Sequence, residues 1–142
     1  MRWGSALAGF MISSAISGIA AAQPNPLAGT WLSTINPGKE SVIYVTLVFA
    51  PNGQMSERFM NRLGIAYELL GTYRFDAASG ALQFVFTDYA PRQLCSPLGC
   101  QSAPVPPNPL NVTNTAQITF PNPSQMIGKA ADGSVMIWGR SG

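Results

Sequence analysis

Residues 66–89 read AYELLGTYRFDAASGALQFVFTDY, and this stretch decides the fold. Apolar or small residues occupy every second position in both halves, as expected of strands with one buried face. They are Tyr67, Leu69, Gly71, Tyr73 and Phe75 in the first half, and Leu82, Phe84 and Phe86 in the second. Residues 76–80 separate the halves and are rich in residues typical of turns. The stretch therefore predicts two antiparallel strands joined as a hairpin.

Short β-rich runs separated by Gly, Pro, Asn or Asp continue on both sides of this hairpin, and helical periodicity is nearly absent. The predicted strands are residues 27–35, 42–50, 54–61, 66–75, 81–89, 115–120, 125–129 and 134–140. We therefore predict an all-β domain of about eight antiparallel strands in an up-and-down barrel. A sandwich stays open as the alternative, because residues 42–50 are apolar on both faces and their outer side would then need a covering layer.

Residues 90–114 interrupt the series of short turns. The segment holds six prolines, both cysteines of the chain (Cys95 and Cys100) and little β pattern. Cysteines so close in sequence pair with each other in an oxidising compartment, so we expect a structural disulfide, with a redox pair or two free thiols as the alternatives. Long loops in compact domains are often functional. We expect a partly ordered flap, either a plain surface excursion or a lid over the barrel mouth.

The first 22 residues have the pattern of a cleavable signal peptide. Arg2 precedes a run without acids, bases or amides, and the run ends in Ala20-Ala21-Ala22. A charged start, an apolar middle and small residues before the cleavage site are the secretory signature. No basic cluster follows, which favours cleavage after Ala22 over a retained membrane helix. We expect residues 1–22 to form a signal-peptide helix and residues 23–142 to form one secreted or periplasmic domain without stable membrane insertion.

The composition excludes several classes of function. Cleavage would remove Arg2 and leave seven basic and six acidic residues, so no basic surface points to a nucleic-acid partner. The chain has no histidine, which excludes a Ser-His-Asp or Cys-His arrangement and removes the commonest metal ligand. We expect a protein that is not an enzyme and uses no cofactor and no metal.

The remaining charged and aromatic residues suggest where a ligand could bind. Glu57 and Glu68 are expected to form solvent-exposed cross-strand ion pairs with Arg58 or Arg74. Aromatic side chains are numerous enough to line an apolar pocket in which tyrosine hydroxyls bind polar groups. The candidate ligand-binding residues are Tyr44, Tyr67, Tyr73, Phe84 and Phe86. A barrel of this size encloses either side chains or one small ligand, so a filled interior stays open as well.

The first and last predicted strands carry a family resemblance. Gly29-Thr30-Trp31, taken with Arg140, resembles the corresponding strands of lipocalins and related calycin barrels. Gly71-Thr72-Tyr73-Arg74-Phe75 is similar to a segment of small bacterial lipocalin-like domains. The resemblance implies that Trp31 closes one end of the barrel and that Arg140 packs across its ring, a cation–π contact that contributes about 0.5–2 kcal/mol.

Two functions follow as expectations. The lipocalin resemblance implies an exported barrel that binds a small, mostly apolar ligand in its interior. The alternative is an exported protein-interaction module, such as a protease inhibitor or an envelope factor, that acts through its surface or through residues 90–114. The oligomeric state stays open.

Overall fold

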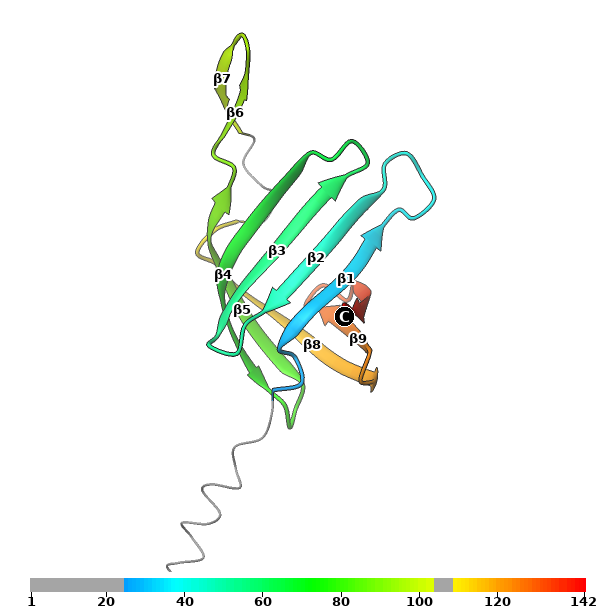
Figure 1. The fold of residues 1–142 in the computed structure, drawn as a ribbon. Coiled ribbons are helices and arrows are strands. Elements are labelled where there is room, and N and C mark those ends of the chain that lie inside the picture. The colour runs from blue at the N-terminus through cyan, green and yellow to red at the C-terminus, as the bar shows by residue number, and fades with distance from the viewer. Residues whose placement is uncertain (1–24, 104–108) are drawn as a thin grey trace, which may run out of the picture.

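The alternating runs of the sequence form the wall of a closed antiparallel β-barrel (Figure 1). The computed structural model describes residues 25–103 and 109–142, and the predicted signal peptide, residues 1–22, lies outside the described residues. The strands are β1 (Gly29–Ile35), β2 (Ile43–Phe49), β3 (Gln54–Asn61), β4 (Ala66–Asp76), β5 (Ala81–Ala90), β6 (Gln93–Ser96), β7 (Gly99–Ser102), β8 (Thr113–Asn122), β9 (Gln125–Ala130) and β10 (Val135–Arg140).

The strand order around the barrel is β1-β10-β9-β8-β5-β4-β3-β2. Each predicted segment forms one of these eight strands, so the predicted all-β up-and-down barrel is confirmed and the sandwich is excluded. Neighbours in the chain are neighbours in the sheet, except where β10 returns to β1 and where β5 is followed in the barrel by β8. Between β5 and β8, strands β6 and β7 form a separate two-stranded sheet that the sequence analysis did not predict.

The barrel wall is a single layer, and its inner face carries the core. The core contains Leu27, Trp31, Val45, Leu47, Phe49, Met55, Leu69, Tyr73, Leu82, Phe86, Ile118, Met126 and Trp138. The expectation that another layer covers the outer side of β2 is wrong, because Tyr44 is 45% exposed there. Within residues 25–103 and 109–142 no helix has the length and apolar character that a membrane span requires.

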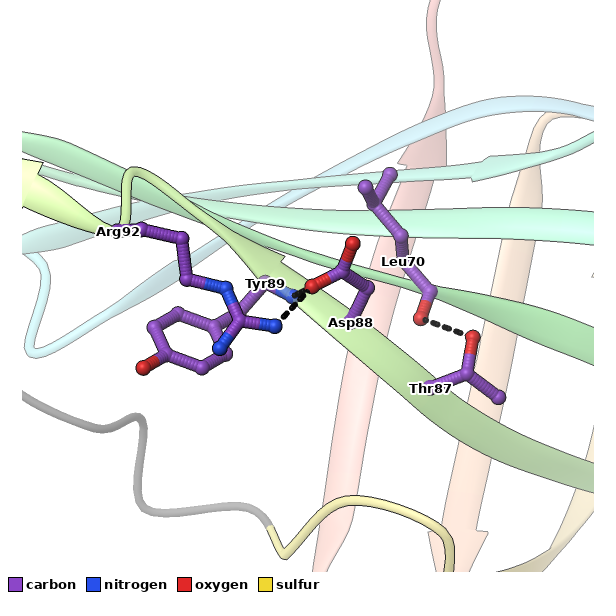
Figure 2. Close-up of polar contacts among 5 residues, drawn as sticks. All are labelled: Leu70, Thr87, Asp88, Tyr89 and Arg92. Carbon is purple, nitrogen blue, oxygen red and sulfur yellow. Dashed lines mark hydrogen bonds and ion pairs between the residues drawn. The ribbon is translucent and has the colours of Figure 1, made fainter.

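A β-bulge interrupts the pairing of β4 with β5. The register shifts between Leu70 and Gly71, and because Gly71 pairs with Phe86, Thr87 becomes the extra residue. Figure 2 shows the Thr87 hydroxyl donating to the Leu70 carbonyl oxygen at 3.5 Å. A Cβ atom at Gly71 would lie 2.0 Å from the Val85 carbonyl oxygen, so the strands can approach this closely only at a glycine.

We predict that Gly71→Ala destabilises the barrel, because the added methyl group would push β4 and β5 apart. The expected loss is about 1–3 kcal/mol in the free energy of unfolding, measured by urea denaturation. Gly139→Ala is the matched control, since a Cβ at Gly139 would meet nothing within 4 Å. Equal stability of the two variants would contradict the assigned role of Gly71.

Candidate functional site

One end of the barrel is closed by Trp31 and the residues around it. Trp31 is fully buried, and its indole nitrogen donates to the carbonyl oxygen of Leu27 at 2.9 Å. The guanidinium carbon of Arg140 lies 4.2 Å from the centre of the Trp31 ring. Phe120 packs on the same indole, with 5.9 Å between ring centroids. The two residues that carry the lipocalin resemblance are therefore in direct contact.

Arg140 ties this closed end together through backbone carbonyl groups. Its guanidinium donates to Pro26 O at 2.8 Å, to Ala28 O at 3.0 Å and to Pro123 O at 3.0 Å. A Cβ at Gly29 would lie 2.6 Å from Arg140 Nη1, so the guanidinium occupies the space that a side chain there would need. Arg140 thus connects the segment before β1 to the turn between β8 and β9 across this end of the barrel.

A cavity of about 410 Å³ lies inside the barrel, next to this closed end. Its lining includes Leu47, Phe49, Met55, Phe59, Phe84, Ala116, Met126, Gly128, Met136 and Trp138. The lining also includes Ile35, Ser134 and Val135, which lie at the far ends of β1 and β10 from Trp31. Because these lining residues lie at those strand ends, the cavity extends to the barrel end opposite the closed one, which we call the mouth. Volume and apolar lining are those of small-molecule sites.

Glu57 is the charged residue in this lining. It lies on β3 between Met55 and Phe59, and its register partners Leu47 and Leu69 are both apolar. Burial raises the pKa of the Glu57 carboxyl from its usual 4.5 to about 7, because the charged form loses its hydration in apolar surroundings. The sequence-based expectation of a solvent-exposed ion pair at Glu57 is wrong, since strand alternation turns this side chain inward.

The structure brings two of the candidate ligand-binding residues to the cavity region on β5. Phe84 lines the cavity. Phe86 is almost fully buried and packs edge-on against Phe84, with 5.5 Å between ring centroids, so it contacts the lining without belonging to it. Their common face was predicted from the alternation of Leu82, Phe84 and Phe86.

The three candidate tyrosines lie in different places. Tyr67 stacks on Phe59 of the cavity lining at 4.9 Å between ring centroids. Tyr73 lies at the closed end, where its hydroxyl donates to Ala50 O at 2.6 Å and accepts from Asn25 Nδ2 at 2.9 Å. Tyr44 lies on the outer surface, because the neighbouring Val45 faces inward, and it is therefore not part of the cavity lining.

The segment after β5 leaves the barrel on the mouth side and forms the β6–β7 hairpin, which extends away from the barrel (Figure 1). The predicted disulfide is present, because Cys95 and Cys100 face each other in the hairpin register and are bonded. Leu98, in the turn at its tip, is 98% exposed. This geometry is that of a surface excursion projecting beyond the barrel. Residues 104–108, part of the predicted flap, lie outside the described residues.

An ion pair stands at the base of the hairpin. Figure 2 shows Arg92 bound to the Asp88 carboxylate and lying over the ring of Tyr89, with its guanidinium carbon 3.9 Å from the ring centre. The hydrogen bond from Arg92, together with one from the Tyr89 backbone N–H, lowers the pKa of Asp88. Among residues 25–103 and 109–142, no three Asp, Glu, Cys or His side chains are grouped so as to hold a metal ion.

No protein-family model and no curated protein matches this chain. The fold is consistent with a calycin-like barrel, and the candidate site is defined by its own geometry.

We predict that the stability of the protein falls as the pH rises from 5 to 8. In this window the folded protein holds a proton on Glu57 that the unfolded chain has released, so ionisation opposes folding. A pKa raised from 4.5 to about 7 corresponds to a loss of about 3 kcal/mol in the free energy of unfolding. The lowered pKa values of Asp76, Asp88 and Asp132 place their titration below this window.

Urea denaturation at pH 5 and pH 8 measures this loss. Glu57→Gln should abolish most of it and be the more stable protein at pH 8, whereas Glu40→Gln, in an exposed turn, should behave as the wild type. Wild-type stability that is flat or rises between the two pH values would show that Glu57 ionises freely.

Proposed function

We propose that the barrel binds one small, mostly apolar ligand in its interior. The ligand enters through the mouth. The observation that carries this proposal is the apolar cavity of about 410 Å³ above a barrel end sealed by Trp31 and Arg140. Close packing normally fills the interior of a small domain, so a space of this size represents lost dispersion contacts unless a ligand occupies it. A sealed base and an accessible opposite end suit a binding site.

We further propose that the protein acts outside the cytoplasm. The Cys95–Cys100 disulfide supports this, because such bonds persist in oxidising compartments. The leader pattern of residues 1–22 points the same way. A binder in the periplasm or the medium would take up an apolar compound that is poorly soluble in water and shield it within the barrel.

Filling the cavity should abolish ligand binding without unfolding the protein. Gly128 lines the cavity on β9, and a Cβ there would make ordinary contacts of 3.5 Å and longer, so Gly128→Leu places its side chain in the empty space. Gly139→Leu, on the neighbouring strand β10, adds the same atoms where nothing lies within 4 Å. We expect a compound retained by the wild type and by Gly139→Leu to be lost from Gly128→Leu.

The measurement is native mass spectrometry of the protein purified from its own host, with denaturing extraction of the bound compound. The neutral fluorescent probe N-phenyl-1-naphthylamine provides a second test, in which Gly128→Leu should show at least about a tenfold weaker affinity. Absence of any retained compound, together with no probe binding to the folded wild type, would refute the binding function.

A second function, binding of a protein partner, is favoured by the β6–β7 hairpin. The hairpin is cross-linked by a disulfide and carries an almost fully exposed leucine at its tip, so it is a preorganised projection.

We predict that a partner would bind through Leu98. Leu98→Asp should then abolish binding of a partner purified from the same compartment, measured with the two isolated proteins, while affinity for the lumen probe stays unchanged. A partner that binds Leu98→Asp as tightly as the wild type would exclude the hairpin as its site.

A further inference from the structure

Glu57 presents an unpaired carboxylate to the cavity. No hydrogen bond or ion pair joins it to another residue of the described ranges 25–103 and 109–142, where the one ion pair is Arg92–Asp88. In the same ranges, no fully buried side-chain oxygen lacks a hydrogen-bond partner. The Glu57 oxygens must therefore keep accessible surface, and the accessible space beside them is the cavity that Glu57 lines.

The surrounding strands offer this carboxylate no positive charge. On either side of β3, its register partners are Leu47 and Leu69. The charged neighbours Arg58 and Glu68 belong to the alternate, outward-facing positions of β3 and β4. The other strands that line the cavity contribute apolar residues, Ser134 and the Trp138 indole, and none of these is a cation. The cavity lining thus holds no counter-charge for Glu57, and a cation that enters the cavity would supply one.

Two aromatic rings lie on the same strand pair as Glu57. Phe59 follows Glu57 by two residues on the same strand face, and Tyr67 stacks on it with an interplanar angle of 18°. Burial raises the pKa of Tyr67, and the nearby negative charge of Glu57 raises it further. The faces of aromatic rings attract cations and disfavour anions, so these rings and the carboxylate select the same charge.

We propose that the ligand of this lumen carries one protonated amine on an apolar body, with Glu57 as the counter-ion of the amine. This inference rests on the proposed binding function and specifies its ligand class. The ammonium group binds the Glu57 carboxylate beside Phe59 and Tyr67, and the apolar body extends between Phe84 and Trp138, which line the same cavity. A charge-assisted hydrogen bond away from water is about twice as strong as a neutral one. A ligand with the amine should therefore bind more tightly than a neutral ligand of the same shape.

Two probes of nearly equal size separate this inference from the binding function itself. 1-Naphthylmethylamine is protonated at pH 8, and 1-naphthalenemethanol is its neutral counterpart. We expect calorimetry at pH 8 to show the amine binding wild-type protein at least about tenfold more tightly than the alcohol. The Glu57→Gln variant should bind the amine at least about tenfold more weakly than the wild type does. Its affinity for the alcohol should change by less than about twofold.

The alternative outcomes each exclude something different. If both probes bind the wild type equally and Glu57→Gln changes neither affinity, the lumen binds ligands but the amine inference is wrong. If Glu57→Gln lowers the affinity for both probes by the same factor, Glu57 shapes the cavity rather than pairing with a cation. The inference is then wrong as well. If neither probe binds the folded wild type, the inference fails together with the proposed function.

Proton release provides a readout that a purely structural role of Glu57 would not change. With a pKa of about 7, Glu57 is half protonated at pH 7, and pairing with an ammonium group requires the ionised form. Amine binding at pH 7 should therefore release about half a proton per ligand, detected by calorimetry in buffers of different ionisation enthalpy. Release should be absent in Glu57→Gln and with the alcohol, and an amine that binds the wild type without proton release would overturn the proposal.

Discussion

Closure of the barrel depends on a short seam between β1 and β10. β1 pairs with β2 along its whole length, but its pairing with β10 consists of Trp31 with Arg140 and Leu32 with Gly139. The Arg140 side chain reinforces this seam, because it binds carbonyl groups before β1 and in the β8–β9 turn while it covers the Trp31 ring. Without the seam, β1 and β10 would be free edges, and the inner face would enclose no space. The cavity and its sealed base are thus consequences of one contact.

Local patterns were sufficient to predict the barrel, because each wall strand is a β-rich run bounded by turn residues and several of the strands alternate. The β6–β7 hairpin could not be predicted in this way, since every residue of both strands is exposed and no alternation marks an inner face. Its disulfide could be predicted, because pairing depends on spacing and compartment rather than on burial. The only indication of the bulge in the sequence is the glycine that follows Leu70. The bulge could not be predicted from it, because the carbonyl group that excludes a side chain at Gly71 comes from another strand.

The candidate site was predicted in part, and the two errors have different causes. Phe84 was assigned to the inner face because it alternates with Leu82 and Phe86 along β5. Tyr44 was misplaced because β2 is apolar on both faces, so alternation there does not reveal which face is inside. Glu57 was expected outside because it is charged, although the two-residue spacing from Met55 through Glu57 to Phe59 already indicated an inward position. For Glu57 the position in the strand pattern was a better guide to its orientation than its charge.

The position of Glu57 opposes the stability of the empty barrel. A buried carboxylate that must ionise as the pH rises destabilises the fold, and a neutral side chain of the same shape would remove that penalty. A ligand that supplies a positive charge beside Glu57 would bind the folded state alone, because the unfolded chain has no cavity, and would stabilise it by mass action. The same unpaired charge that weakens the empty protein then strengthens the occupied one, so occupancy and stability rise together.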